Sequence, residues 1–208
     1  MDREGFLSSI LAVIGATATP TPKPTPAPSS TLAPWDQCIE STALSYDRPI
    51  DIVMQTLDGP DFHLLKYRGQ AVLLNIFATW CGPCKLEQPL IVDAADRYSA
   101  QGLAVIGIND RDPDDHVRAY RKKYGITYPI AMDRQGGFTR ALELGHGAQR
   151  DASAYLPSTL FITPQGFLYC YLVGTVSRDE LDYRVKKFLV EAPPTLTPSP
   201  SPTPTGSV

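Results

Sequence analysis

Trp80-Cys81-Gly82-Pro83-Cys84 stands close behind the apolar run Ala71–Ala78 (AVLLNIFA). The run is nearly continuous in apolar, β-branched and aromatic residues, which is typical of a strand buried on both faces. Apolar residues then recur near helical spacing from Leu86 to Ala94, so a helix is predicted to begin around Pro83. The two cysteines are therefore expected at the junction between a buried strand and a helix.

The two cysteines of this stretch are the candidate catalytic groups. Cys81 is expected at the helix N-terminus, where unpaired backbone N–H groups and the helix dipole favour a thiolate. A thiolate is the nucleophile of disulfide exchange, and Cys84, one turn later, is placed to attack the resulting mixed disulfide. Trp80, Gly82 and Pro83 are expected to support this site, Pro83 because the first helical turn does not need its N–H. The spacing predicts a redox-active Cys81–Cys84 disulfide and no separate cofactor.

The elements around this junction predict an α/β domain. Further strands are expected at Asp51–Leu57, Leu103–Ile108, Tyr128–Met132, Ser158–Thr163 and Phe167–Val173, and further helices at Asp114–Tyr124, Phe138–Leu144 and Ser177–Val190. The alternation of strands and helices in the first half indicates parallel strands joined by right-handed crossovers. Pro164 and Gly166 lie between the last two strands and predict a hairpin turn there.

The region from about Asp51 to about Val190 resembles the thioredoxin superfamily. Within it, the chain is similar to the TlpA/ResA branch of membrane-anchored, extracytoplasmic thiol–disulfide oxidoreductases. The run Leu74–Cys81 resembles that branch's strand into its active site, and Lys85–Pro89 resembles its acid-then-proline continuation. The resemblance implies a thioredoxin-like three-layer α/β fold with a central mixed sheet, helices on both faces, and a redoxin (AhpC/TSA-like) domain.

Further site residues follow from this resemblance. Thioredoxins carry a buried acid six residues before the first cysteine; here Asn75 stands at that position, as is usual in this branch. Glu87, one turn after Cys84, is the relocated acid, expected to shuttle a proton and tune a thiol pKa; an ordinary acid near the helix dipole is the alternative. Pro157 matches the superfamily's cis-proline, whose preceding residue, here Leu156, pairs with extended substrate. A trans proline at a strand start is the alternative.

Two cysteines remain outside this site. Cys170 lies in the apolar run Phe167–Val173 as a small buried residue, and Cys38 precedes the domain. In an oxidising compartment the two can pair, so a Cys38–Cys170 disulfide is a hypothesis alongside two separate thiols. A structural zinc site needs a second pair of ligands at similar spacing, which the sequence lacks, so no metal site is expected.

Both ends of the chain differ in composition from its middle. Of its 20 prolines, six lie in Pro20–Pro34 and six in Pro193–Pro204, among Thr and Ser, which predicts extended disordered tracts. The uncharged run Phe6–Ala18 suits a signal peptide or a short membrane anchor and favours an extracytoplasmic location, membrane-anchored or secreted, over a cytosolic one. The expected organisation is that segment at 1–18, a linker at 19–46, the thioredoxin-like domain at 47–191 and a disordered tail at 192–208.

Charge and resemblance together narrow the expected partners. The net charge of −3, from 19 Lys and Arg against 22 Asp and Glu, gives no reason to expect nucleic acid as a partner. The resemblance implies protein disulfide substrates, in cytochrome c or metal-site maturation, and a membrane electron donor. Gly-Pro between the cysteines matches thioredoxin, so a reductant is preferred over an oxidant.

Two other functions stay open at this point. The first is a redoxin-type thiol peroxidase, whose pattern places Pro and Thr or Ser seven and three residues ahead of its reactive cysteine. Here those positions hold Leu74 and Ala78, so the pattern fails. The second is a non-catalytic tethered binding module, against which the intact pair of Cys81 and Cys84 argues.

Overall fold

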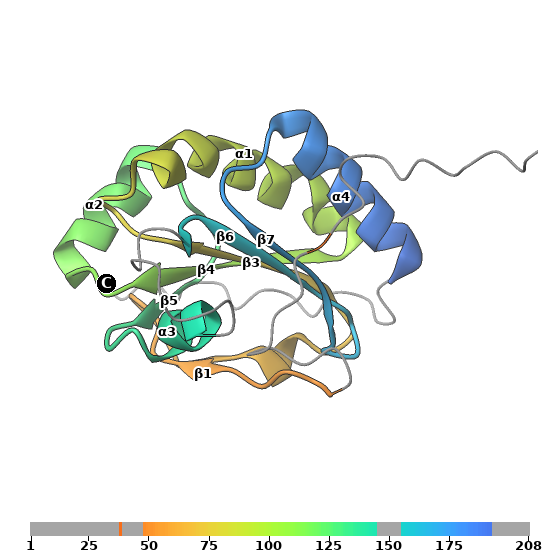
Figure 1. Cartoon of the computed structure of the whole chain (residues 1–208), viewed down its shortest axis with the longest axis horizontal. Coiled ribbons are helices and arrows are strands. Elements are labelled where there is room, and N and C mark those ends of the chain that lie inside the picture. The colour runs from red at the N-terminus through yellow and green to blue at the C-terminus, as the bar shows by residue number, and fades with distance from the viewer. Residues whose placement is uncertain (1–37, 39–47, 145–154, 193–208) are drawn as a thin grey trace, which may run out of the picture. The chain divides into compact units, whose positions relative to one another are not determined.

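A central sheet of five strands organises the domain in the computed structural model, which describes Cys38, residues 48–144 and residues 155–192 (Figure 1). The strands are β3 (Ala71–Phe77), β4 (Leu103–Asp110), β5 (Ile130–Asp133), β6 (Ser158–Ile162) and β7 (Leu168–Val173). Their order across the sheet is β5-β4-β3-β6-β7. The first three strands run parallel, while β6 is antiparallel to β3 and β7 to β6. The predicted mixed sheet is therefore confirmed.

Helices cover both faces of this sheet. The helices α1 (Gly82–Tyr98), α2 (Asp114–Tyr124) and α4 (Arg178–Glu191) lie on the upper face in Figure 1, and α3 (Gly137–Leu144) lies on the lower face. The short antiparallel pair β1 (Val53–Met54) and β2 (Phe62–His63) also lies below the sheet. Short 3-10 helices, Leu64–Tyr67 and Ser99–Gln101, complete the elements of the described part. This is the three-layer α/β fold that the resemblance implied.

The middle strand explains why this order forms. All seven residues of β3 are buried, because β4 and β6 flank it in the sheet and the helical layers cover its two faces. Gly102 follows the helical segment after α1 with a φ of 88°, a left-handed conformation that suits glycine, and leads the chain into β4. Gly125, with a φ of 65°, ends α2 in the same way. The sequence predicted both ends of α2 as the structure has them.

The segment before β3 differs from its prediction. The strand expected at Asp51–Leu57 is limited to β1, and Thr56 forms only an isolated bridge with Ala131 of β5. The stretch expected as a connector between this segment and β3 holds both β2 and a 3-10 helix. The segment crosses between the lower layer and the edge of the sheet, so no partner strand runs along its whole length. Apolar alternation could not reveal this, since it reports burial and not the extent of pairing.

The helix α4 begins as predicted, and side-chain hydrogen bonds hold its first turns. The Ser177 hydroxyl accepts a hydrogen bond from the Glu180 backbone N–H at 3.2 Å, so Ser177 is the N-cap. The Glu180 carboxylate accepts a hydrogen bond from Arg184 Nε at 3.0 Å. Arg184 is largely buried, and its guanidinium nitrogen also lies 3.6 Å from the Cys170 sulfur. The salt bridge therefore holds a buried cation against α4 and β7.

Cys38 and Cys170 form a disulfide, which confirms the pairing hypothesis. Their Cα atoms lie 5.2 Å apart, and 132 positions separate them in the sequence. Cys170 pairs in register with Phe161 of β6 and is only 2% exposed. The disulfide joins the segment before the domain to one of the last strands of the sheet.

The other predictions for the chain ends fall outside the described residues. These are the apolar segment at 1–18, the linker at 19–46 apart from Cys38, and the tail beyond Ala192. Most of the polar stretch 145–155 lies outside as well, Tyr155 excepted. Among the residues that the structure does describe, none belongs to a helix with the length and apolar character needed to cross a membrane.

Candidate active site

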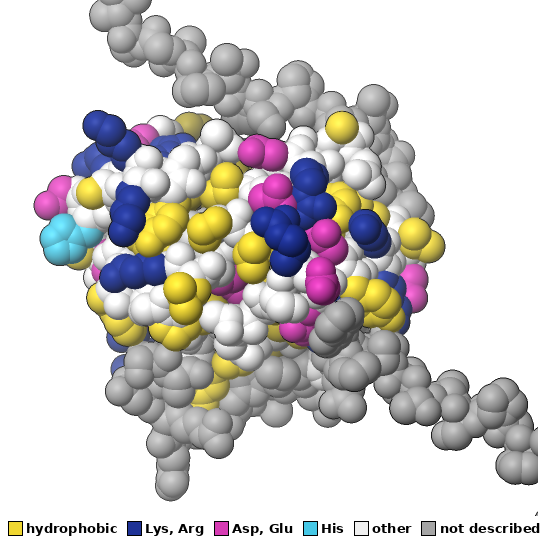
Figure 2. Space-filling view, turned by 90° about the horizontal axis from the view of Figure 1, so that it is seen from above, with side chains coloured by type: hydrophobic (Ala, Val, Ile, Leu, Met, Phe, Trp, Pro, Cys, Tyr) yellow, Lys and Arg dark blue, Asp and Glu magenta, His cyan; other side chains and the backbone are white. Residues whose placement is uncertain are grey.

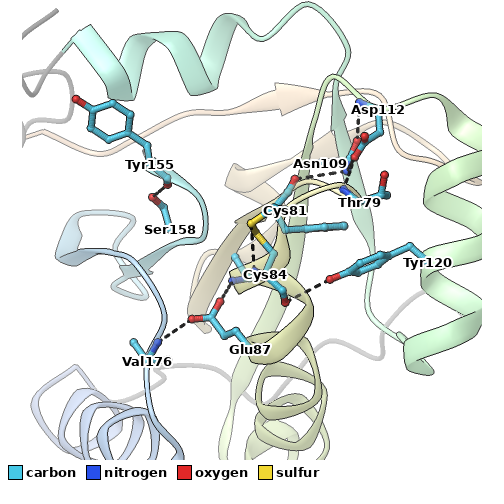
Figure 3. Close-up of a disulfide and its surroundings, with 12 residues drawn as sticks. Thr79, Cys81, Cys84, Glu87, Asn109, Asp112, Tyr120, Tyr155, Ser158 and Val176 are labelled. Carbon is cyan, nitrogen blue, oxygen red and sulfur yellow. Dashed lines mark hydrogen bonds between the residues drawn. A yellow bond between two sulfur atoms is a disulfide. The ribbon is translucent and has the colours of Figure 1, made fainter. Parts of the chain in front are cut away.

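Cys81 and Cys84 are joined in a disulfide at the junction of β3 and α1 (Figure 3). Their Cα atoms lie 5.3 Å apart, and Cys81 is the N-cap residue of α1. The exposed fraction is 4% for Cys81 and 2% for Cys84. The predicted junction is therefore present, and Cys81 is the slightly more accessible partner.

The backbone at the start of α1 is arranged to stabilise negative charge on Cys81. The Cys84 N–H points at the Cys81 Sγ at 3.1 Å, and Pro83 occupies the first turn of the helix. A helix N-terminus carries a partial positive charge, and an N–H donor favours a thiolate over a thiol. Gly82 has open space around its Cα, so no backbone contact requires a glycine there. The arrangement makes Cys81 the nucleophile of choice when the disulfide is reduced.

Glu87 is a buried carboxylate on the same face of α1, one turn beyond Cys84. It is 2% exposed, and its two oxygens accept hydrogen bonds from Asn75 Nδ2 at 2.9 Å and the Val176 N–H at 3.0 Å. Burial raises the pKa of Glu87 to about 7, although both hydrogen bonds act in the opposite direction. Figure 3 shows the carboxylate between Cys84 and Val176. The structure thus brings Asn75 and Glu87 together, next to the pair, with a carboxyl that titrates near neutral pH.

A second polar network, which the sequence did not reveal, anchors the loop before Cys81. The buried Asp112 carboxylate accepts hydrogen bonds from the Thr79 backbone N–H at 2.6 Å and from Asn109 Nδ2 at 2.8 Å. Asn109 Oδ1 accepts in turn from the Asp112 N–H at 3.2 Å. On the other side, the Tyr120 hydroxyl donates to the Cys84 carbonyl at 3.3 Å. The only sequence signal for Asp112 is its place just after a buried strand of the parallel part of the sheet.

The Leu156–Pro157 peptide bond is cis, as predicted. Pro157 directly precedes β6, whose residue Ser158 pairs with Ile76 of β3, so it lies level with the end of the strand that leads to Cys81. The Pro157 carbonyl accepts a hydrogen bond from the Gly174 N–H at 2.8 Å, and Leu156 is 5% exposed. The substrate-pairing role of Leu156 and Pro157 stays a prediction.

Two large apolar side chains that lie close to the pair in the sequence are exposed. Trp80 is 53% exposed and Leu86 78% exposed. Both flank the cysteines in the sequence and offer an apolar surface to an approaching polypeptide. Among the described residues, no group of three or more His, Cys, Asp or Glu side chains is placed to hold a metal ion.

Comparisons with known proteins agree with this geometry. The model of the AhpC/TSA family matches residues 47–170. The thiol-disulfide oxidoreductase ResA of Geobacillus thermodenitrificans is 30% identical over 131 residues, which cover 63% of this chain and 70% of ResA. The thioredoxin-like protein YneN of Bacillus subtilis is 30% identical over 138 residues, or 65% of this chain and 75% of YneN.

A solved structure gives the same result for the fold. The thiol:disulfide interchange protein of the thioredoxin family from Chlorobium tepidum superimposes with a TM-score of 0.58 at 30% identity, over 68% of this chain and 97% of that protein. The residues that the family model matches, 47–170, include the strand–helix junction with its paired cysteines. The chain therefore belongs to the AhpC/TSA family, as a ResA-like thiol–disulfide oxidoreductase of the thioredoxin superfamily.

Proposed function

We propose that the chain reduces disulfides in exported proteins, with Cys81 as the attacking group. The observation that supports this most directly is the position of the Cys81 Sγ at the N-terminus of α1, with the Cys84 N–H at 3.1 Å. A sulfur held in this way is favoured as a thiolate, which is the species that attacks a disulfide. The reducing direction is proposed because Gly82 and Pro83 between the cysteines match thioredoxin, which lies on the reducing side of the potential range.

The proposed cycle starts from the reduced pair. The Cys81 thiolate attacks one sulfur of the substrate disulfide, forming a mixed disulfide and releasing the other substrate sulfur as a thiolate. Cys84 then attacks the Cys81 Sγ, which forms the Cys81–Cys84 disulfide and releases the second substrate sulfur. Two electrons have passed to the substrate, and the resulting disulfide is the state that the structure describes. An external donor of two electrons restores the dithiol.

Glu87 supplies the proton acceptor for the second step in this proposal. Cys84 must lose its proton before it can attack, and Glu87 lies one turn away on the same helix face. A carboxyl with a pKa of about 7 is partly ionised at neutral pH and is suited to both taking up and releasing a proton. Asn75 and the Val176 N–H orient the carboxylate, so they act as positioning groups.

The proposed setting is outside the cytoplasm, where exported proteins acquire disulfides. The Cys38–Cys170 disulfide supports it, because a stable structural disulfide is rare in reducing compartments. The substrates proposed are proteins in cytochrome c or metal-site maturation, whose cysteines must be reduced before they bind their group. The proposed electron donor lies in the membrane, to which the apolar segment at 1–18 would hold the chain.

The reduction potential of the Cys81–Cys84 pair tests the direction of this function. The full chain is equilibrated against glutathione and dithiothreitol buffers, its thiols are alkylated, and mass spectrometry of peptides distinguishes this pair from Cys38–Cys170. A potential near or below about −270 mV, that of thioredoxin, is expected for a reductant. A potential near about −120 mV, at the strongly oxidising end, would reverse the assigned direction.

The two alternative functions make different predictions for one variant. If the chain is a non-catalytic binding module, the Cys81→Ser variant keeps its affinity for the partner. If the chain is a reductase, the same variant no longer reduces insulin disulfides. A thiol peroxidase consumes hydrogen peroxide at a rate that a Cys81→Ser variant lacks. Leu74 and Ala78, at the positions of the peroxidase motif, are fully buried apolar residues and offer no hydroxyl to a peroxide.

A further inference from the structure

An open groove lies beside the cysteine pair, between the start of α1 and the helix α2. It has a volume of about 300 Å³. The described residues that line it are Thr79, Lys85, His116, Ala119, Tyr120, Lys123 and Tyr124. None of these carries a carboxylate, whereas two are lysines and one is a histidine. The wall of the groove is thus basic and aromatic.

Two carboxylates lie near this groove without lining it: Asp112 accepts a hydrogen bond from the Thr79 N–H at 2.6 Å, and Asp115 directly precedes His116. Other acidic side chains nearby pair with arginines that do not line the groove. Asp58 pairs with Arg118 and Arg121, and Asp114 pairs with Arg134. Within the described part of the chain, neither the Lys85 nor the Lys123 ammonium group forms an ion pair. Figure 2 shows Lys and Arg side chains beside hydrophobic ones over the α2 end of the helical face.

The groove adjoins the backbone that carries the reacting pair, although neither cysteine lines it. The Tyr120 hydroxyl, from its wall, donates to the Cys84 carbonyl at 3.3 Å. Thr79 lies two positions before Cys81, and Lys85 follows Cys84 directly. An extended polypeptide advances about 3.3 Å per residue. A substrate whose cysteine reaches the Cys81 Sγ can therefore place side chains from a few positions away in this groove.

We propose that the groove binds an acidic segment of the substrate polypeptide, next to the cysteine that is attacked. This inference rests on the proposed reduction of protein disulfides and adds a substrate class to it. Carboxylates complement the two ammonium groups, and the half-buried ring of Tyr124 offers a contact to the aliphatic part of an acidic side chain, whereas the Tyr120 ring is buried against Phe77. The chain as a whole carries a net charge of −3 and therefore weakly repels acidic polypeptides. The positive charge of the groove attracts an acidic segment locally and so discriminates between substrates.

Matched peptides test this proposal. Two synthetic disulfide-linked peptides differ only in three residues beside the cysteine, which are Glu in one and Gln in the other. The reduced full chain is mixed with each at pH 7, and the second-order rate constant of reduction is measured. The acidic peptide is expected to react about five- to tenfold faster at low salt, and the ratio is expected to fall toward one at about 0.5 M salt.

A pair of variants assigns this preference to the groove. His116→Gln/Lys123→Gln removes groove residues that lie away from the cysteines, and it is expected to reduce the ratio to about twofold or less. The neutral peptide should react at an unchanged rate, which shows that the chemistry is intact. Lys122→Gln, at the neighbouring exposed position of α2 outside the groove, is the control and should keep the full ratio.

The outcomes separate the groove from the proposed function. An equal rate for both peptides with the unmodified chain, or an equal loss of preference in the Lys122→Gln control, overturns the groove as an acidic-segment site. Failure to reduce either peptide counts against the proposed function instead. In that case, equilibrium binding of both peptides to the oxidised chain decides the groove, and equal affinities overturn it.

Discussion

Single buried polar residues set the chemistry around the cysteine pair. Glu87 illustrates this, because its carboxyl is almost completely buried and yet keeps two hydrogen-bond donors, Asn75 and the Val176 N–H. Burial disfavours the charged form more than these donors favour it, so the pKa rises to about 7. The resemblance to the thioredoxin superfamily pointed to Glu87 and Asn75, through the positions that they occupy relative to the cysteines. It could not point to Val176, whose N–H comes from a segment 89 positions away.

Glu87 is expected to make the stability of the chain depend on pH. Its pKa lies near 4.5 in an unfolded chain and near 7 in the folded one, so the folded state binds more protons between these values. Stability should therefore fall as the pH rises through this window, by about 3 kcal/mol in all. Urea unfolding of the oxidised chain at pH 5 and pH 8 measures this fall. In Glu87→Gln the fall should be smaller by that amount, and parallel profiles for both proteins would contradict the assignment.

The same residue is expected to shape the pH dependence of disulfide reduction. If Glu87 accepts the proton of Cys84, the rate should rise with pH around an apparent pKa near 7, where the carboxyl ionises. In Glu87→Gln this inflection should vanish, and the rate at pH 8 should drop by about 10- to 100-fold. Single-turnover reduction of insulin between pH 5 and pH 9 gives the profile. An unchanged inflection in the variant would assign it to another group.

Asp112 is expected to contribute to stability through the loop before Cys81. Replacing it by Ala leaves the Thr79 N–H without its side-chain acceptor and removes one of the two acceptors of Asn109 Nδ2, the other being the Phe77 carbonyl. The loss of a buried acceptor costs about 1–3 kcal/mol, so the urea midpoint should shift accordingly. Asp61→Ala, at an exposed position, serves as the control and should change stability by less than about 0.5 kcal/mol. A similar small effect of both substitutions would mean that the loop does not depend on Asp112.

At the scale of elements, the helix α1 gives the pair its asymmetry. Cys81 caps the helix, whereas Cys84 lies inside its first turn and donates its N–H to the Cys81 sulfur. The two thiols therefore experience different surroundings although only three positions separate them. Only the outer one benefits from both the helix dipole and the backbone donor.

This asymmetry predicts different rates of alkylation. In the reduced full chain at pH 7, Cys81 should react with iodoacetamide roughly tenfold faster than Cys84, because a larger fraction of it is thiolate and it is more exposed. Peptide mass spectrometry after timed quenching resolves the two sites. In about 6 M guanidinium chloride, where the helix is lost, the rates should become equal. Equal rates in the folded chain would mean that the helix N-terminus does not distinguish the sulfurs.

The elements themselves could be predicted to the extent that their signals are local. The limits of α2 follow from the apolar spacing of Val117 and Tyr120 and from Gly125, and the buried strands follow from continuous apolar runs. The short pairing of β1 could not be foreseen, since it depends on where the sheet edge ends. The contact between Asp112 and Thr79 joins two loops 33 positions apart, and no periodicity reports such a contact.

At the scale of the whole molecule, the Cys38–Cys170 disulfide closes a loop that contains the domain from β1 to the first half of β7 and leaves α4 outside. Its ends are 132 positions apart, so it strongly restricts the unfolded chain. The sequence allowed this pairing but could not require it, because an even number of cysteines is compatible with two separate thiols. The structure decides between them by placing Cys38 against β7.

Removing this disulfide is expected to lower the stability of the chain substantially. In a Cys81→Ser/Cys84→Ser background, which prevents thiol exchange, Cys38→Ser/Cys170→Ser should reduce the free energy of unfolding by about 2–5 kcal/mol. Guanidinium unfolding of both proteins measures the difference. A difference below about 0.5 kcal/mol would show that the unfolded state is already restricted in other ways.

The same disulfide imposes a selectivity on the molecule's own chemistry. If the chain reduces disulfides in other proteins, each copy also carries one disulfide, Cys38–Cys170, that must not be reduced by another copy. The near-complete burial of Cys170 keeps that sulfur from a second copy's Cys81, whereas Cys38 is only partly buried, so any attack on this disulfide falls on the Cys38 sulfur. Formation of the Cys38–Cys170 disulfide requires an oxidant, whereas catalysis requires a reductant for Cys81–Cys84. Oxidation of the first pair must therefore precede reduction of the second. The donor that reduces Cys81–Cys84 therefore has to recognise the residues around this disulfide, so that it leaves Cys38–Cys170 intact.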